Sequence, residues 1–157
     1  MSAKRSFKNT KQNKAKKKQY SSFDQLNGWH PWQDAVKDSY LLYPVRQLEG
    51  GQVAWFNFSL AKEMGLLPNS ANEKLTASLE KKLLETFCLR IVNEYDQENN
   101  IHYTPKVMKP NKYMATRYLQ LQHQDKTGKT SGDGRCIWNG AITHKGKTWD
   151  VSSRGTG

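Results

Sequence analysis

The first twenty residues limit what the chain can fold into more than any other feature. They carry eight lysine or arginine side chains and no acid. The whole chain has a net charge of +11 and this segment +8, which leaves only +3 for residues 21–157. Because like charges repel and the segment has little apolar surface to bury, it cannot form a core. The sequence predicts a disordered Lys-rich tail over residues 1–20 and one folded body over residues 21–157, long enough to bury a core.

Composition also excludes several classes of protein. The tail lacks the apolar run of a secretory signal, and no stretch approaches the roughly eighteen apolar residues of a membrane span. The histidines are scattered without zinc-site spacing. Cys88 and Cys136 lie among apolar neighbours without CxxC spacing, which favours buried free thiols, with a disulfide between them left open. We therefore expect a cytoplasmic protein with no membrane span.

Hydrophobic periodicity predicts two helices. Residues 71–87 place leucine or phenylalanine at every fourth position from Leu75, which indicates an amphipathic helix packed on a core. A shorter helix is expected to begin at Asn57 or Ser59 and to run through Met64, with Gly65 at its C-terminal end.

The remaining segments predict strands and loops. Residues 23–45 are expected to be irregular and held by aromatic side chains, and residues 96–100 to form a loop. Strands are expected over residues 52–58, 88–95, 117–123, 136–143 and 147–153, and "HKG" (144–146) joins the last two as a hairpin. One clear helix among irregularly ordered strands predicts the α+β class.

One glycine-rich cluster precedes the predicted hairpin. Gly132 and Gly134 flank Asp133 and are followed by Arg135. Glycines allow positive φ angles and let the backbone approach a bulky anion, and a guanidinium group suits phosphate oxygens. Asp-Gly is equally a common turn signal between strands. Taken alone, the cluster favours an ordinary turn.

A second cluster, Arg154 to Gly157, follows the predicted hairpin. In a strand over residues 148–153, Trp149, Val151 and Ser153 would face one side, and Asp150, Ser152 and Arg154 the other. Arg154 would then lie at the strand end, where a phosphate could bind. The alternative is an exposed arginine on an ordinary hairpin.

The two clusters together resemble the selenoprotein O family of pseudokinase protein adenylyltransferases. The resemblance consists of "GDGR" (132–135), a strand, a turn, and "WD" (149–150) followed by the "xGxG" ending at 154–157. The segment "SYLLYPVRQLEGGQVAWFNFSLAKEMGL" (39–66) also looks like the N-terminal region of that family. The basic tail lies outside the resemblance.

The resemblance implies a protein-kinase-like fold, of which this chain would be part of the N-terminal lobe. Members transfer AMP from ATP to Ser, Thr or Tyr hydroxyl groups of proteins and use a divalent metal, Mg or Mn. Gly132, Gly134 and Arg135 would contact the nucleotide. Arg154 stands where the family has a phosphate-binding lysine, and a guanidinium group has a different reach and geometry.

The resemblance also implies that the chain is truncated at its C-terminus. In kinase-like folds the catalytic and metal-binding residues follow the first lobe, so they are expected downstream of Gly157 and none is assigned in this chain. Such a fragment would be inactive alone. The alternative hypothesis is a small RNA- or DNA-binding module, in which the basic tail contacts phosphates and aromatic side chains stack on bases. The body's charge of only +3 counts against it.

Overall fold

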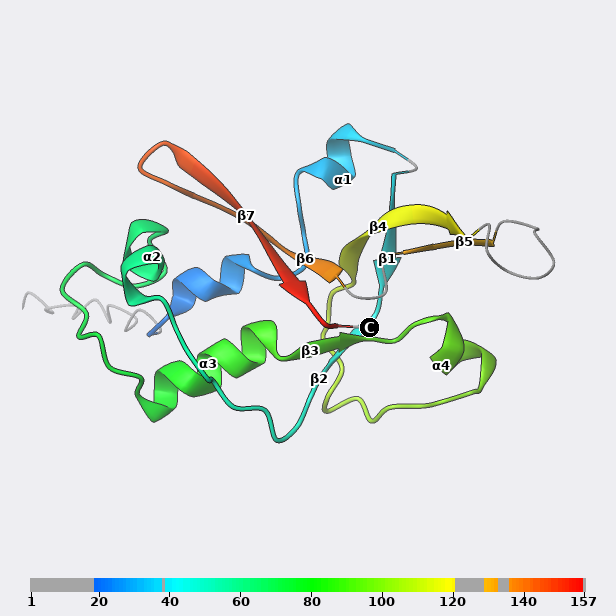
Figure 1. The fold of residues 1–157 in the computed structure, drawn as a ribbon, viewed down its shortest axis with the longest axis horizontal. Helices are drawn as coiled ribbons and strands as arrows, with labels where there is room; N and C mark the ends of the chain where they lie inside the picture. Colours follow the sequence, from blue (N-terminus) through cyan, green and yellow to red (C-terminus); the bar gives the residue numbers. More distant parts are fainter. Residues whose placement is uncertain (1–18, 38, 121–128, 133–135, 157) are drawn as a thin grey trace, which may run out of the picture.

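The computed structural model describes residues 19–37, 39–120, 129–132 and 136–156 of the chain. Short helices and antiparallel strands follow one another in irregular order, so the fold is α+β, as predicted (Figure 1). The helices are η1 (Ser21–Gln25), α1 (Trp32–Ala35), α2 (Phe58–Glu63), α3 (Ala77–Phe87) and α4 (Glu94–Glu98). The strands are β1 (Tyr40–Tyr43), β2 (Val45–Gln47), β3 (Leu89–Ile91), β4 (Tyr113–Gln120), β5 (Lys129–Gly132), β6 (Cys136–His144) and β7 (Lys147–Arg154).

The strands form two antiparallel sheets. In the larger sheet the order is β1-β4-β6-β7, and β5 also pairs with β4. Strands β2 and β3 form the smaller sheet, in which Val45 pairs with Ile91. The predicted strand over residues 117–123 is confirmed as far as Gln120, although β4 begins earlier, at Tyr113; residues 121–123 lie outside the described residues.

The predicted hairpin is confirmed as β6 and β7. Its two-residue turn places both Lys145 (φ 49°) and Gly146 (φ 77°) in the left-handed region, which matches the twist of the strands it joins. A β-bulge between Trp138 and Gly140 shifts the register near the middle of β6. Figure 1 shows the hairpin running from its tip near α2 to the C-terminal residues beside β3.

The apolar side chains form two buried clusters, and β6 contributes to both. Leucines of α3, together with residues of η1 and α2, surround Ile142 in the first cluster. Ile137 lies in the second cluster, with residues of β1 to β4. The two ends of the same strand are therefore anchored in different parts of the core.

Both predicted helices are confirmed, but the longer one begins later than predicted. In α2 the Asn57 side chain accepts a hydrogen bond from the Leu60 amide and caps the helix. Helix α3 begins at Ala77 rather than at residue 71, because the Thr76 hydroxyl accepts from the Leu79 amide at 3.2 Å and caps the chain there. Of the predicted stripe, Leu79 and Leu83 are buried, whereas Leu75, Leu84 and Phe87 are half-buried.

The predicted strand over residues 52–58 is wrong. Residues 51–57 belong to no helix or strand, and α2 begins at Phe58. Val53 and Phe56 pack against the first cluster, and the Val53 amide lies 3.5 Å from a carboxylate oxygen of Glu80 on α3. The alternation in this segment therefore reflects packing beside a helix and not pairing in a sheet.

The predicted strand over residues 88–95 is only partly correct. Strand β3 ends at Ile91, and α4 occupies most of the predicted loop over residues 96–100. A capping box explains the change: the Asn93 side chain accepts from the Asp96 amide, and the Asp96 carboxylate accepts from the Asn93 amide.

Residues 23–45, which were expected to be irregular, contain more regular structure than predicted. The end of the 3-10 helix η1, the short helix α1 and strand β1 all lie here, and β1 pairs with β4 from Tyr40 opposite Thr116. Tyr20, which the sequence assigned to the tail, packs with its ring at right angles to Phe23 and against the first cluster. The tail up to residue 18 lies outside the described residues.

Candidate functional site

The four residues predicted to bind the nucleotide are described unequally. Gly132 is the last residue of β5, and its backbone pairs with Arg117 of β4. Arg154 is the last residue of β7 and its side chain is exposed. Gly134 and Arg135 lie outside the described residues.

Strand pairing places Arg154 directly opposite Cys136, the residue that follows the first sequence cluster, "GDGR", in the chain. Neighbouring strands are only about 4.8 Å apart, so the backbone of Arg154 lies beside the point where "GDGR" enters β6. In the sequence the two clusters are separated by a whole hairpin.

The faces of β7 follow the predicted alternation. Asp150, Ser152 and Arg154 are exposed, whereas Ser153 is buried and Trp149 and Val151 are half-buried. Among the described residues, none forms a hydrogen bond or an ion pair with the Arg154 side chain. The Arg154 side chain is exposed at the strand end, and a guanidinium group can donate charge-assisted hydrogen bonds to an anion.

The residues after Arg154 hold this strand end in place. Gly155 has φ 74°, and an added Cβ atom would meet nothing within 4 Å, so glycine is favoured here by backbone conformation and not by lack of space. Thr156 is buried, and its carbonyl oxygen accepts a hydrogen bond from the Ile91 amide at 2.8 Å. The chain therefore turns sharply after Arg154 and is fastened to β3.

A buried polar network supports the middle of the hairpin. The Asn139 side chain is fully buried; its amide group donates to the Thr86 carbonyl oxygen at 3.2 Å and its oxygen accepts from the Ser153 hydroxyl at 2.7 Å. The next residue, Gly140, has φ 147°, and an added Cβ atom would lie 3.1 Å from the carbonyl oxygens of Gln25 and Trp29. The bulge thus allows the N-terminal segment to lie close against β6.

The sequence did not reveal a contact between His30 and Asp150. The His30 Nε2 atom lies 2.9 Å from the Asp150 Oδ1 atom, although 120 positions separate the residues. Because the Trp32 amide donates to His30 Nδ1 at 3.2 Å, Nδ1 accepts and Nε2 donates to the carboxylate. The imidazole ring is buried, with the Trp138 ring centroid 5.0 Å away. This pair fastens the segment before α1 to β7, and no spacing rule could have found it.

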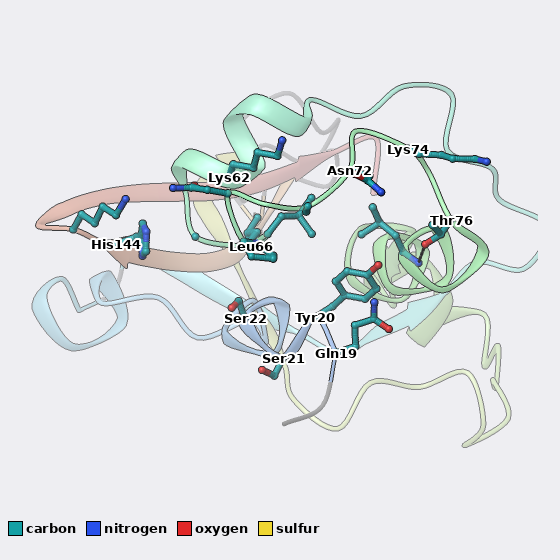
Figure 2. A pocket seen from close by; sticks show the side chains of 17 residues that line it. Gln19, Tyr20, Ser21, Ser22, Lys62, Leu66, Asn72, Lys74, Thr76 and His144 are labelled. Carbon is teal, nitrogen blue, oxygen red and sulfur yellow. Dashed lines mark hydrogen bonds between the residues drawn. The ribbon is translucent and has the colours of Figure 1, made fainter. Parts of the chain in front are cut away.

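A pocket lies at the opposite end of the hairpin from Arg154 (Figure 2). Its volume is about 790 Å³, and its lining comes from the segments around η1, the connection between α2 and α3, and the hairpin tip. Leu66, Leu67 and Leu79 contribute buried apolar side chains, and the edge is polar. No sequence pattern predicted this pocket, because its walls come from segments far apart in the chain.

The structure also describes the two cysteines, the side chains that could bind a metal, and the length and apolar character of the helices. Both cysteines are free thiols; Cys136 is buried and Cys88 is half-buried. In the part of the chain that the structure describes, no three His, Cys, Asp or Glu side chains gather as they would around a metal ion. No helix among the described residues has both the length and the apolar character needed to cross a membrane.

Comparison of the chain with protein-family models, with curated proteins and with solved structures finds no match.

Proposed function

We propose that this chain is the N-terminal part of a protein adenylyltransferase similar to selenoprotein O, and that its body belongs to the N-terminal lobe of a kinase-like fold. In this proposal, ATP phosphates bind at the end of the β6–β7 hairpin where Arg154 meets the "GDGR" segment. The intact protein transfers AMP to Ser, Thr or Tyr hydroxyl groups of other proteins in the cytoplasm.

The pairing of Arg154 with Cys136 is the observation that carries the proposal. It supports a shared location for the two resembling motifs, which a phosphate site needs, because Cys136 directly follows "GDGR" in the chain. The bend at Gly155 and the hydrogen bond from Ile91 to Thr156 add rigidity, and a rigid strand end holds its cation in one direction with less loss of entropy on binding.

The proposed role of each residue at the site follows from its chemistry. Backbone N–H groups near Gly132 and Gly134 would contact phosphate oxygens, because no Cβ atom keeps the ligand away. Arg135 and Arg154 would each donate charge-assisted hydrogen bonds. With arginine in place of lysine at position 154, the cation presents a planar fork of donors and not a point charge.

The reaction itself requires residues that we do not assign here. The hydroxyl oxygen of the target attacks the α-phosphorus of ATP, the bond from that phosphorus to the bridging oxygen of the β-phosphate breaks, and pyrophosphate leaves. The hydroxyl proton passes to a base. A divalent metal, Mg or Mn, would neutralise phosphate charge in the intact protein, and no described residue is proposed as its ligand. This chain contributes binding and orientation of the phosphates.

Titration of ATP into the protein by calorimetry tests the site. Arg154→Ala should weaken ATP binding by about 2 kcal/mol, or about 30-fold, because a charge-assisted contact is lost. Arg154→Lys should lose less, since a point charge remains. Both variants should unfold within about 0.5 kcal/mol of the parent, because the side chain is exposed.

Lys145→Ala is the matched control, since Lys145 is an exposed cation at the other end of the same hairpin. Its ATP affinity should equal that of the parent. The transferase activity is assayed on the longest product of the gene, with ATP labelled at the α-phosphate and a mixture of acceptor proteins. Equal ATP affinities for the parent, Arg154→Ala and Lys145→Ala would overturn the assignment of the phosphate site.

A further inference from the structure

The pocket at the hairpin tip has the chemistry of a second binding site, separate from the proposed phosphate site. Strand β6 has nine residues, so its two ends lie about 27 Å apart. The pocket adjoins His144 and Lys145 at one end of the hairpin, whereas Arg154 lies at the other. A ligand in the pocket and a phosphate beside Arg154 would therefore not share contacts.

The interior of the pocket is apolar and pre-formed. Leu66, Leu67 and Leu79 are between 2% and 6% exposed, so their positions are determined by the core and not by a ligand. The wall near the hairpin tip is rigid, because the His144 ring packs directly over Gly65, and an added Cβ atom there would lie 2.6 Å from His144 Nδ1. The volume of about 790 Å³ is within the usual range for binding pockets.

The edge of the pocket is cationic. Lys62, Lys74, Lys145 and His144 line it, and no acidic side chain is among the described residues that do. Lys62 is already paired with Glu73 at 2.9 Å, so Lys74 and Lys145 are the cations left for a ligand. Figure 2 shows His144 at one end of the pocket and Lys74 and Thr76 at the other. Because Lys145 follows His144 in the chain, the lysines Lys145 and Lys74 lie on opposite sides of the apolar centre.

Polar side chains that suit a peptide backbone complete the edge. Asn69, Asn72 and Gln19 carry amide groups that both donate and accept hydrogen bonds, and Ser21 and Ser22 add hydroxyl groups. An extended peptide presents such donors and acceptors at every residue. The chain's own first eighteen residues are an unsuitable occupant, since they carry only basic charges and would be repelled by the lysines.

We propose that this pocket binds a short segment of a partner protein in which acidic residues flank one or two apolar residues. The apolar side chains would enter the space above Leu66, Leu67 and Leu79, and the acidic side chains would reach Lys74 and Lys145. The site is independent of ATP binding and of the proposed transfer reaction.

Fluorescence anisotropy with labelled peptides tests the proposal on the whole 157-residue chain. The probe is Asp-Glu-Leu-Leu-Glu-Asp. One control peptide, Asn-Gln-Leu-Leu-Gln-Asn, lacks the charges, and a second, Asp-Glu-Ser-Ser-Glu-Asp, lacks the apolar side chains. The probe should bind at least about tenfold more tightly than either control, because it alone supplies both kinds of contact.

Charge reversal locates the binding. The double variant Lys74→Glu with Lys145→Glu should weaken probe binding by about tenfold, since each change replaces an attraction with a repulsion. Lys81→Glu is the matched control: its side chain is 79% exposed on α3, outside the pocket lining, and its binding should change less than twofold. If the double variant has a lower melting temperature than the parent, Lys74→Gln with Lys145→Asn provides the same test, because asparagine tolerates the left-handed conformation of Lys145.

Two results would overturn the proposal. One is equal binding of the probe to the parent and to the charge-reversed variant. The other is binding of the small aromatic anion 2-naphthoate without binding of the probe peptide, which would assign the pocket to a small molecule. Titration of ATP into the same variants should give the parent affinity, so the outcome is separable from that of the phosphate-site experiment.

Discussion

The two ends of the β6–β7 hairpin differ in what surrounds them. At one end Arg154 projects from the strand beside Cys136, and the chain then bends at Gly155 and is tied to β3 through Thr156. At the other end a tight turn closes the strands. That tip contacts α2 through the Lys147–Glu63 ion pair and its neighbour Gly65 through the His144 ring.

One hairpin carries two kinds of surface because each of its ends packs on a different apolar cluster. Ile137 anchors the Arg154 end in the buried apolar cluster formed with residues of β1 to β4. Ile142 anchors the tip in the buried apolar cluster formed with α3, η1 and α2. A change at the tip should therefore alter stability and the pocket without altering phosphate binding. A change of the Arg154 side chain should alter phosphate binding without altering stability or the pocket.

The largest effect is expected where the tip contacts the connection after α2. Gly65→Ala should lower the free energy of unfolding by about 3 kcal/mol, because the position has φ 72° and the new Cβ atom would lie 2.6 Å from His144 Nδ1. Gly50→Ala is the matched control, since Gly50 has φ 76° and nothing within 4 Å; it should lose only about 1 kcal/mol. Denaturant unfolding of the two variants measures the difference. Equal losses would show that the His144 contact adds nothing.

A smaller effect is expected in the middle of the hairpin, which both ends share. Asn139→Ala should cost about 2 kcal/mol, because it leaves the Thr86 carbonyl oxygen and the Ser153 hydroxyl without their partner in a buried place. Ser153→Ala, which removes only one of the two hydrogen bonds, should cost about 1 kcal/mol. Denaturant unfolding compares them, and a milder loss for Asn139→Ala than for Ser153→Ala would contradict the proposed network.

The smallest effect concerns the second cluster, which supports the Arg154 end. Burial raises the pKa of Tyr113 above its ordinary value of 10.0. The unfolded chain therefore releases this proton at a lower pH than the folded chain does. The protonated Tyr113 hydroxyl therefore contributes fully to the free energy of unfolding below pH 10. This contribution is lost as the pH rises through the folded-state pKa, and the free energy of unfolding falls by no more than about 1.4 kcal/mol per pH unit.

Tyr113→Phe should remove this alkaline loss while changing stability little at pH 7, since the one partner of the hydroxyl among the described residues is the Leu26 carbonyl oxygen, at a long 3.5 Å. Unfolding curves between pH 9 and pH 11 measure the change in slope. The control Tyr95→Phe removes a hydroxyl from an exposed ring. A slope for Tyr113→Phe equal to that of the parent would refute the assignment.

Local sequence signals predicted the elements whose causes are local. Asn57 caps α2, and the four-residue leucine spacing marks α3, so both helices were expected. The hairpin was expected from its alternation and its Lys-Gly turn, and the exposed side of β7 followed from the same alternation. The start of α3 was predicted too early, because the periodicity continues before the cap at Thr76.

Features that depend on residues far apart in the chain were predicted wrongly or were not predicted. The alternation around Val53 and Phe56 looked like a strand, but that segment packs beside α3 and has no strand partner. Strand β1 was missed because only its pairing with β4 distinguishes it from irregular structure. The contact of His30 with Asp150 spans 120 positions and follows no spacing rule.

The sequence alone showed where charge and apolar surface are concentrated, and it predicted two of the helices, α2 and α3, and the β6–β7 hairpin. Caps, periodicity and turn residues act within a few positions, so they can be read without the fold. Only the tertiary structure decided that Arg154 lies beside the entry of "GDGR" into β6 and that a cationic pocket lies at the far end of the same hairpin. The reason is strand register and packing: both join residues far apart in the chain through contacts that no local pattern encodes.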